Sequence, residues 1–393
     1  MVEKAFIVVG LGYGDEGKGI ATDFLCSKYP HSLVIRFNGG HQAGHAVVND
    51  KGEKHIFSNF GAGTLRNIPT FWSKFCTFCP PYFIEELYQL DIKPKFYIDK
   101  NCPITTHYDI LYNRLSEISQ KDKRKGSCGV GIGATVDRNK NGVTFSINDL
   151  LNEAMVAKKL KQIRTYYRTL VNIETNFNYD DFDHEENDKI FLDSIKELKL
   201  LVTEQIFNPT TEKEIFTKKT WQYLIFEGAQ GIMIDQNFGT KPYITKSNTT
   251  SQNAISIIKR NNVDCEVDMF YVTRCYQTRH GNGYFKPPHK KFKLINNSDE
   301  TNIENQYQGI LRANFIDVDD LNYAISCDKI FSECANNNIL ITCLDHLPDD
   351  SITYFKRNEL QKINCNKFPE LLNYGFDKIY LSRSNVSTKI YNV

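Results

Sequence analysis

The stretch Val8-Val9-Gly10-Leu11-Gly12-Tyr13-Gly14-Asp15-Glu16-Gly17-Lys18-Gly19 decides the fold of this chain. It continues the apolar run Ala5-Phe6-Ile7, which indicates a buried strand, and it precedes residues 20–25, whose apolar spacing is typical of the start of a helix. Strand, glycine-rich loop and helix together form a phosphate site, because backbone N–H groups and the helix N-terminus face the anion and glycine permits close approach. The stretch therefore predicts an α/β protein with an anion site in this loop.

Two nucleotide-binding patterns overlap in the loop, and neither fits it completely. Its glycines match the dinucleotide pattern G-x-G-x-x-G, while Gly12, Gly17 and Lys18 match the P-loop pattern G-x-x-x-x-G-K. A P-loop has Ser or Thr after the lysine to hold magnesium, and this chain has Gly19. A dinucleotide loop has no use for a carboxylate, which would repel pyrophosphate. We therefore expect Asp15 to hold a metal that bridges to phosphate or to act as a base beside it; the alternative is a tight turn with solvated acids.

The composition is that of an ordinary globular protein. The 393 residues are 41% hydrophobic and 24% charged, with a formal net charge of +1, so no global field points to nucleic acid or to a membrane as partner. No apolar run is long enough to span a bilayer, and residues 1–4 lack a signal-peptide pattern. We expect a cytoplasmic protein whose partners are small molecules.

The eleven cysteines show no disulfide-framework spacing. Cys76 and Cys79 form a lone C-x-x-C pair, and no second pair stands at zinc-site spacing. We expect reduced, mostly buried thiols; a metal-binding or redox-active pair is the alternative.

Two further glycine-rich segments are candidate site loops. A strand at residues 32–37 runs into Asn38-Gly39-Gly40-His41-Gln42-Ala43-Gly44-His45, and two histidines in a glycine-rich loop at the end of a strand favour chemistry over a structural role. The segment Gly126-Ser127-Cys128-Gly129-Val130-Gly131-Ile132-Gly133 offers a hydroxyl, a thiol and backbone amides to an oxyanion or phosphate; a flexible surface loop is the alternative.

The rest of the chain alternates strand-like and helix-like segments. We expect a helix near 82–90, strands near 223–226, 269–272, 339–345 and, as the last, 378–381, and a helical subdomain at 150–219 in which Ile190, Leu192, Ile195, Leu198 and Leu201 form the apolar face. The acidic run 180–186 is expected to be a solvated loop, and 286–308 a mobile substrate loop. The alternation predicts one domain over 1–393, built on a large, mainly parallel sheet with helices on both faces.

Four segments in this order and spacing resemble the adenylosuccinate synthetase family: residues 14–19, residues 38–45, Phe226-Glu227-Gly228-Ala229-Gln230-Gly231 and Ser247-Asn248-Thr249-Thr250. The resemblance runs from Val8 to about Leu381. It implies that family's P-loop-related fold and a ligase that joins L-aspartate to C6 of a 6-oxopurine nucleoside monophosphate, IMP first of all. The reaction would pass through a 6-phosphoryl intermediate and would be driven by GTP or ATP with Mg²⁺.

The resemblance also implies roles for single residues. Asp15 would take the purine N1 proton and hold Mg²⁺ together with Gly44, and His45 would stabilise phosphoryl oxygens; the catalytic set is Asp15, His45 and Gln230. The triphosphate would meet Gly14, Glu16, Gly17, Lys18, Gly19, Gly44 and Asp345. The purine monophosphate would meet Asn38, Gln42, Cys128, Gly129, Gln230 and Thr245, and aspartate would meet Arg312. The family is typically a homodimer in which each subunit contributes an arginine to the monophosphate site of the other. The resemblance assigns this role to Arg138 or Lys140.

The chain departs from the family at positions that contact substrates. Gln42 stands where the family has Asn, Cys128 replaces Thr, and Thr342-Cys343-Leu344-Asp345 lacks the lysine that lies against guanine, so ATP is an alternative to GTP. The arginine-rich loop is reduced to one arginine at 307–317, and the position that touches the 2′-hydroxyl is Ile310.

An apolar residue at position 310 favours a deoxyribonucleotide, because an unpaired buried hydroxyl costs about 1–3 kcal/mol. Phage-type relatives that act on dGMP are therefore an alternative to the IMP reaction. Two other classes stay open: a non-catalytic nucleotide-binding relative, which the lost arginines favour, and a nicotinamide oxidoreductase. The latter requires an acid about 20 residues after the glycine loop, and nothing convincingly fills that position.

Overall fold

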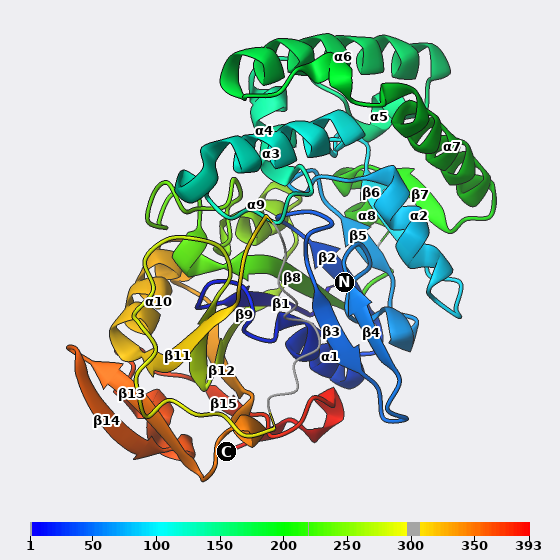
Figure 1. Cartoon of the computed structure of the whole chain (residues 1–393). Helices are drawn as coiled ribbons and strands as arrows, with labels where there is room; N and C mark the ends of the chain where they lie inside the picture. The colour runs from blue at the N-terminus through cyan, green and yellow to red at the C-terminus, as the bar shows by residue number, and fades with distance from the viewer. Residues whose placement is uncertain (1, 219, 297–306) are drawn as a thin grey trace.

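A ten-stranded sheet forms the centre of the protein, seen in a computed structural model that describes residues 2–218, 220–296 and 307–393 (Figure 1). The strand order is β16-β15-β12-β9-β1-β8-β2-β5-β6-β7, and every neighbouring pair is parallel except β15 and β16. The strands are β1 (Lys4–Gly10), β2 (Ser32–Arg36), β5 (Thr70–Trp72), β6 (Phe96–Asp99), β7 (Phe207–Thr210), β8 (Tyr223–Gly231), β9 (Glu266–Arg274), β12 (Asn336–Thr342), β15 (Lys378–Leu381) and β16 (Tyr391–Asn392). The predicted mainly parallel sheet is confirmed. The expectation that 378–381 is the last strand is wrong, because the short β16 follows it.

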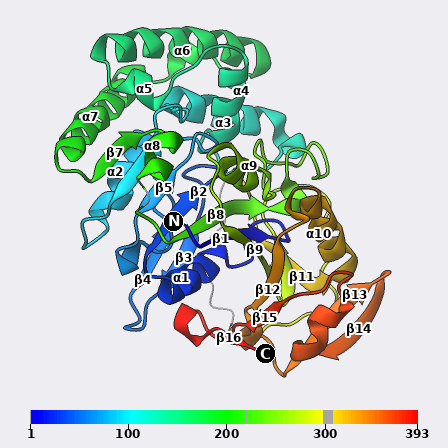
Figure 2. The same cartoon turned by 180° about the vertical axis from the view of Figure 1, so that it is seen from behind.

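Alternate residues of β1 face opposite sides of the sheet, as the pleat requires. Ala5, Ile7 and Val9 belong to the core that includes α9 (Gln252–Arg260) and α10 (Val318–Ser332), whereas Phe6 and Val8 pack with α1 (Lys18–Lys28). Both faces are therefore covered by helices, which explains why the central strands read as continuous apolar runs. Figure 2 shows α9 and α10 from the side opposite to that seen in Figure 1.

A separate layer of helices lies beyond the β6–β7 edge (Figures 1 and 2). It is built from α3 (His107–Gln120), α4 (Ile132–Lys140), α5 (Ile147–Leu150), α6 (Glu153–Glu174) and α7 (His184–Thr203), while α2 (Pro80–Tyr88) packs against β6 and β7 through Phe83. The predicted helical range 150–219 needs correction at both ends. α3 and α4 precede it, and its last part is β7, which pairs with β6 as the edge strand, followed by α8 (Glu212–Thr217).

The buried face of α7 also differs from the predicted one. Ile195, Leu198 and Leu201 are buried as expected, but Ile190 and Leu192 are exposed, and the face is completed by Phe191. The acidic run 180–186 contributes the start of this helix, where the Asp183 carboxylate accepts hydrogen bonds from the N–H groups of residues 185 and 186. An acid at this position stabilises a helix N-terminus, so the run is only in part a loop.

A smaller four-stranded sheet, in the order β10-β11-β13-β14, stands beside the large one, and a hairpin follows β2. The strands are β10 (Tyr276–Arg279), β11 (Arg312–Asp317), β13 (Ser351–Lys356) and β14 (Glu359–Asn364), and those of the hairpin are β3 (His45–Val48) and β4 (Lys54–Phe57). Short 3-10 turns complete the chain: η1 (Thr64–Arg66), η2 (Lys121–Lys123), η3 (Tyr179–Asp181), η4 (Ile232–Ile234), η5 (Leu344–His346), η6 (Cys365–Leu371) and η7 (Ser387–Lys389). Of the expected mobile loop 286–308, residues 297–306 lie outside the described residues, and 286–296 and 307–308 are irregular.

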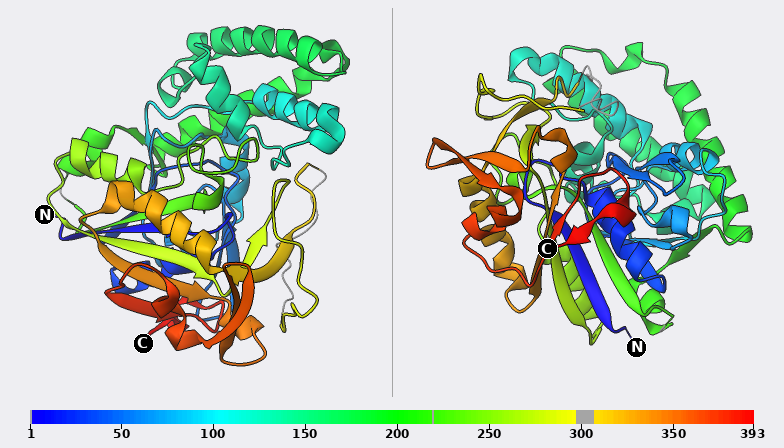
Figure 3. Two further views of the ribbon diagram at one scale, coloured as in Figure 1. Left: turned by 90° about the vertical axis from the view of Figure 1, so that its left-hand side faces the viewer. Right: turned by 90° about the horizontal axis from the view of Figure 1, so that it is seen from below.

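The predicted site loops follow β1, β2, β8 and β12, and carboxyl ends of parallel strands meet at one edge of a sheet. Two further views show this edge between the helical layer and the smaller sheet (Figure 3). In the described part of the chain, each helix is too short or too polar to serve as a membrane span.

Candidate functional site

The loop after β1 is closed around an internal ion pair. The Glu16 carboxylate accepts hydrogen bonds from the N–H groups of Gly12 (3.0 Å) and Gly14 (2.8 Å), and the buried Lys18 amine donates to Glu16 and to the Gly14 carbonyl. A Cβ on Gly10 would lie 2.2 Å from Glu16 Oε2, so this residue must be glycine. Glu16 and Lys18 hold the loop in shape through these bonds, and their contact with the triphosphate stays a prediction.

Asp15 lies at the open side of the same loop. Its side chain is 33% exposed, its Oδ2 is 3.3 Å from Nε2 of His280, and its carbonyl accepts a hydrogen bond from the partly buried Arg274. Gln230, at the end of β8, lies against the loop, since a Cβ on Gly14 would be 3.6 Å from its Oε1. The structure therefore brings the predicted base and the predicted amide together.

Gln230 adopts a left-handed backbone conformation with φ of 65°, although it is not glycine. Such conformations are uncommon for residues with a side chain and cluster at functional sites. Cys343, between β12 and the predicted guanine-reading Asp345, shares this feature with φ of 60°. The Asp345 side chain is partly exposed at η5.

A buried histidine–carboxylate pair stands beside the loop. Nδ1 of His45 is 2.6 Å from Oε1 of Glu227, and Oε2 of Glu227 accepts the Ala62 N–H at 3.1 Å. Burial lowers the pKa of His45 against the opposing effect of Glu227. Burial also acts to raise the pKa of Glu227, but His45 and Arg36 outweigh it and hold that pKa below its usual value. Glu227 is thus ionised and orients the imidazole.

Glu227 is a site residue that the sequence reasoning did not assign. It belongs to the 226–231 segment, and its signal is an acid at the end of a buried strand. The start of α1 lies against this pair, because a Cβ on Gly19 would be 2.8 Å from Cβ of His45. Gly19 therefore gives the histidine loop access to the helix N-terminus.

Asn38, predicted to meet the purine monophosphate, bonds to the backbone of the neighbouring strand. It is fully buried, and its amide exchanges two hydrogen bonds with the backbone of Ala229, at 2.8 and 2.7 Å. The residue joins the ends of β2 and β8. Gln42, in contrast, is partly exposed, and its Nε2 lies 2.9 Å from where a Cβ on Gly39 would be.

His41 is the second histidine of the loop, and it is buried. Its ring packs on Tyr82, with centroids 4.6 Å apart. Burial lowers the pKa of His41 to about 3, against the weaker effect of the Val130 backbone. The imidazole is therefore neutral near pH 7.

The third glycine loop, residues 126–133, is shaped by three glycines with a left-handed backbone conformation and by the carboxylate of Glu117. Gly126, Gly129 and Gly131 have φ of 78°, 71° and 83°, and the Glu117 carboxylate accepts the Gly126 N–H at 3.0 Å. Gly131 begins α4, so N–H groups converge at this helix start. Burial raises the pKa of the predicted ligand Cys128 to about 11, which keeps its thiol protonated.

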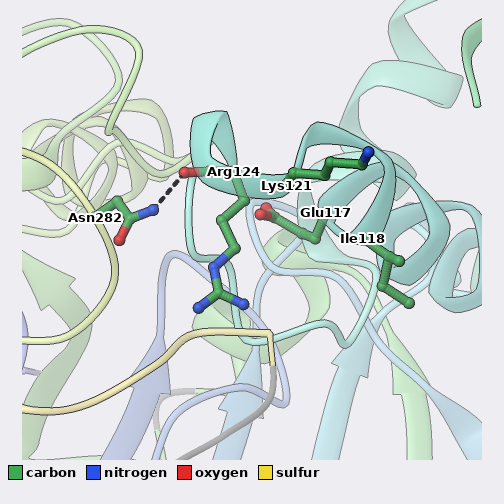
Figure 4. A pocket seen from close by; sticks show the side chains of 5 residues that line it. All are labelled: Glu117, Ile118, Lys121, Arg124 and Asn282. Carbon is green, nitrogen blue, oxygen red and sulfur yellow. Dashed lines mark hydrogen bonds between the residues drawn. The ribbon is translucent and has the colours of Figure 1, made fainter.

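A cavity of about 520 Å³ opens next to this loop. Figure 4 shows its lining, in which the end of α3 and η2 face the loop that follows β10; the lining residues are Glu117, Ile118, Lys121, Arg124 and Asn282. On the other side of the loop, the Tyr307 ring packs on Gly129, and the Arg114 guanidinium lies 5.4 Å from the centre of that ring. Segments from α3, β10 and β11 thus meet around residues 126–131.

Arg312, the predicted aspartate ligand, is at the start of β11. It donates to the carbonyls of Gly283 (3.0 Å) and Gly281 (2.6 Å) and lies opposite Arg279 on β10. Burial and the neighbouring Arg279 lower the pKa of Arg312. Two guanidinium groups on adjacent strands favour an anion. Ile310 is 67% exposed, and Thr245 is partly exposed, with its N–H bonded to the Ile234 carbonyl.

Burial distinguishes the two basic residues of α4 and describes the cysteine pair. Arg138 is fully buried and paired with Asp109 at 2.8 Å, whereas Lys140 is exposed. Cys76 and Cys79 are both buried, and burial raises the pKa of both thiols. Residues 2–218, 220–296 and 307–393 contain no cluster of three or more His, Cys, Asp or Glu side chains able to hold a metal.

The oxygen donors near the loop nevertheless suit Mg²⁺. Asp15 offers an accessible carboxylate and Gly44 an exposed backbone segment, and Gly19 and His45 hold the two loops in contact. Mg²⁺ commonly binds through one or two protein oxygens with phosphates and water completing its shell. The residues present therefore fit a magnesium ion.

Comparisons with known proteins agree with this geometry. The family model described as adenylosuccinate synthetase matches residues 7–349. The adenylosuccinate synthetase of Haemophilus influenzae (strain PittEE) is 29% identical over 291 residues, which cover 72% of this chain and 64% of the relative; that of Pseudoalteromonas translucida is 30% identical over 289 residues, covering 72% and 63%. The chain thus spans slightly less than two thirds of the length of these relatives.

Two solved structures share the fold. Fully ligated adenylosuccinate synthetase from Plasmodium falciparum has a TM-score of 0.78 at 17% identity, covering 99% of both chains. Succinoaminodeoxyadenylate synthetase of cyanophage S-2L, bound to dGMP and to dATP as an energy donor, has a TM-score of 0.62 at 12% identity, covering 100% of this chain and 96% of that one. With a family model that matches most of its length and the same arrangement of strands and loops, the chain belongs to the adenylosuccinate synthetase family.

Proposed function

We propose that this protein is a ligase that joins L-aspartate to C6 of a 6-oxopurine nucleoside monophosphate, with IMP as the first candidate, at the expense of GTP or ATP. The observation that carries the proposal is the meeting, at one sheet edge, of an accessible carboxylate in a glycine loop with a histidine oriented by Glu227. Binding alone requires neither group, so the pair favours turnover over a non-catalytic relative.

The reaction divides into two steps. In the first, Asp15 takes the N1 proton while the purine O6 attacks the γ-phosphorus of the triphosphate, and the nucleoside diphosphate leaves. In the second, the amine of aspartate attacks C6, the C6–O6 bond breaks, and inorganic phosphate leaves with the former O6. His45, whose Nδ1 is held by Glu227, turns Nε2 toward the phosphoryl oxygens. Gln230 faces the same loop and contacts the purine.

Magnesium and a second subunit are part of the same proposal. Asp15 and the Gly44 carbonyl would hold Mg²⁺, which supplies positive charge to the phosphates when bound. Gln42, Cys128, Gly129 and Thr245 would surround the monophosphate. The triphosphate would lie against Gly14, Gly17 and Gly19 and reach Asp345, and Arg312 would receive a carboxylate of aspartate. A cytoplasmic homodimer in which Lys140 meets the partner's monophosphate completes the proposal.

A second candidate substrate is dGMP, and Ile310 favours it. An exposed apolar side chain at this position offers no hydrogen bond to a ribose 2′-hydroxyl. The cyanophage enzyme, whose structure holds dGMP and dATP, has the same fold. Retention of Asp15, a base matched to a purine N1 proton, keeps the IMP reaction in first place.

Phosphate release measured over a substrate panel tests the proposal. IMP, dIMP, GMP and dGMP are each combined with GTP or ATP, Mg²⁺ and aspartate, and reactions without aspartate serve as controls. We expect aspartate-dependent release with one monophosphate well above the others, and a product that gains the mass of aspartate minus water. Absence of release in every combination, with nucleotide binding retained, would identify a non-catalytic relative.

A further inference from the structure

The loop after β10 contacts the predicted base, and the proposed mechanism gives it no role so far. This loop, residues 280–283, leaves the smaller sheet and passes between the phosphate loop and the third glycine loop. Its first residue, His280, is partly buried with 20% of its side chain exposed, and its Nε2 lies 3.3 Å from Oδ2 of Asp15. A contact of this kind orients a carboxylate that would otherwise rotate about its side-chain bonds.

The 280–283 loop is fixed from two directions. On one side, both terminal nitrogens of Arg312 donate to its carbonyls, at Gly281 and Gly283. On the other side, Asn282 donates through its side chain to the Arg124 carbonyl at 2.6 Å, drawn as a dashed line in Figure 4, and through its N–H to the Lys125 carbonyl at 3.2 Å. These bonds tie the loop to β11 and to the segment before Gly126.

The backbone packing leaves the loop no room to shift. A Cβ on Gly126 would lie 2.7 Å from Cα of Gly281, and a Cβ on Gly283 would lie 2.4 Å from Nη2 of Arg279. Gly281 and Gly283 have φ of 73° and 104°, which glycine adopts without strain. The backbone that carries His280 is therefore held by its surroundings and does not depend on the contact with Asp15.

We propose that His280 is a positioning residue: its Nε2–H donates to Oδ2 of Asp15 and holds that carboxylate in the orientation that accepts the purine N1 proton. The inference rests on the proposed function, because it assigns His280 to the first step of that reaction. A carboxylate has four lone-pair directions, so one bond to His280 leaves acceptor positions for the substrate proton and for a cation.

Amide substitutions separate this role from simple packing. In His280→Gln the side-chain amide nitrogen falls near the position of Nε2 and can donate to Asp15, whereas in His280→Asn it falls near Nδ1 and cannot. His280→Leu keeps the bulk and removes both nitrogens. A matched control is His31→Leu, since His31 is exposed and precedes β2 at the opposite edge of the sheet.

The readout is the first step alone. With triphosphate and monophosphate present and aspartate absent, reversible transfer of the γ-phosphoryl group scrambles isotope between the bridging and terminal oxygens of the β-phosphate. We expect His280→Leu and His280→Asn to slow the scrambling and kcat by about 10²-fold, the cost of misplacing a reacting group by about 1 Å. We expect KM for the monophosphate to stay within about threefold, His280→Gln to retain most of the rate, and His31→Leu all of it.

Two contrary outcomes can be told apart. If the wild-type protein is active and His280→Leu scrambles at the wild-type rate, or if Gln and Asn lose the same activity, the positioning role of His280 is wrong while the proposed function stands. If the wild-type protein neither scrambles isotope nor releases phosphate with any member of the substrate panel, the proposed function is wrong and this inference falls with it. Thermal unfolding of each variant identifies a loss caused by misfolding, and a melting temperature that falls in step with the rate counts against the positioning role.

Discussion

The carboxylate of Glu227 lies 2.6 Å from Nδ1 of His45 although 182 residues separate them in the chain, and both side chains are buried. Replacing Glu227 with Gln keeps the shape and removes the negative charge that orients and stabilises the imidazole. We expect kcat for phosphate release to fall by about 10²-fold or more, within the range of a lost acid–base group. Steady-state kinetics on the folded variant measures this, and an unchanged kcat would contradict the role of the pair.

Asp15→Ala removes the proposed base. Phosphate release should fall by about 10²–10⁴-fold, because O6 becomes nucleophilic only when the N1 proton is taken. Triphosphate binding, followed by calorimetry, should be largely intact, since the loop is shaped by Glu16 and Lys18. Near-normal release in this variant would exclude Asp15 as the base.

Neutral His41 makes folding stability depend on pH. Burial holds its pKa at about 3, below the usual 6.5. Between these two pH values the unfolded chain binds a proton at this residue, whereas the folded protein does not. This group therefore destabilises the fold progressively as pH falls from 6.5 toward 3, by roughly 1.4 kcal/mol per pH unit. His41→Phe keeps the packing on Tyr82 and should flatten that part of the profile, measured by urea unfolding from pH 7 to pH 4. Equal acid slopes in the two proteins would rule the effect out.

Arg138 is expected to act on stability and not across a subunit interface. Its guanidinium donates to Asp109 and to the carbonyls of Ile104 and Val143, and Tyr167 also donates to Asp109. Arg138→Met leaves Asp109 buried without its counter-ion, so the free energy of unfolding should drop by about 3–5 kcal/mol.

Lys140→Met is the control for this prediction, because it changes an exposed end of α4 and should alter stability by no more than about 0.5 kcal/mol. A fully stable but inactive Arg138→Met protein, restored by mixing with another inactive variant, would instead demonstrate an arginine shared between subunits.

Ile310→Arg tests the sugar preference. An arginine at this exposed position of the loop before β11 could donate to a ribose 2′-hydroxyl, which isoleucine cannot. We expect the ratio of kcat/KM for IMP over dIMP to rise by about tenfold, a hydrogen bond of about 1.4 kcal/mol. Competition between the two nucleotides in one reaction gives this ratio directly, and an unchanged ratio would place the 2′-hydroxyl elsewhere.

The parts of the fold that sequence reasoning found are those with local signals. Strand, glycine loop and α1 are contiguous, and central strands covered on both faces read as uninterrupted apolar runs. β7 was missed because Phe-Asn-Pro-Thr is short and half polar, and only its pairing with β6 makes it a strand. The exposed Ile190 was assigned to the buried face of α7 because periodicity alone cannot show which neighbouring residue meets the core.

The sequence indicated which loops form the candidate site, but not the contacts of their single side chains. Gln230 lies against the loop that carries Asp15, and His45 lies against the start of α1. Glu16, Lys18 and Asn38 form hydrogen bonds within the protein that the sequence did not indicate. Contacts such as Glu227 with His45 or His280 with Asp15 join segments more than 180 residues apart, and no spacing rule along the chain encodes them. Only the sheet order brings these segments together.

The groups proposed to activate the purine and the group proposed to receive the second substrate belong to different sheets. Asp15 lies in the loop after β1 and Glu227 lies on β8, both strands of the ten-stranded sheet, whereas Arg312 begins β11 of the smaller one. Substitutions on β11 and in the loop before it can therefore change the group that would receive the second substrate, while the contact between Glu227 and His45 stays as it is.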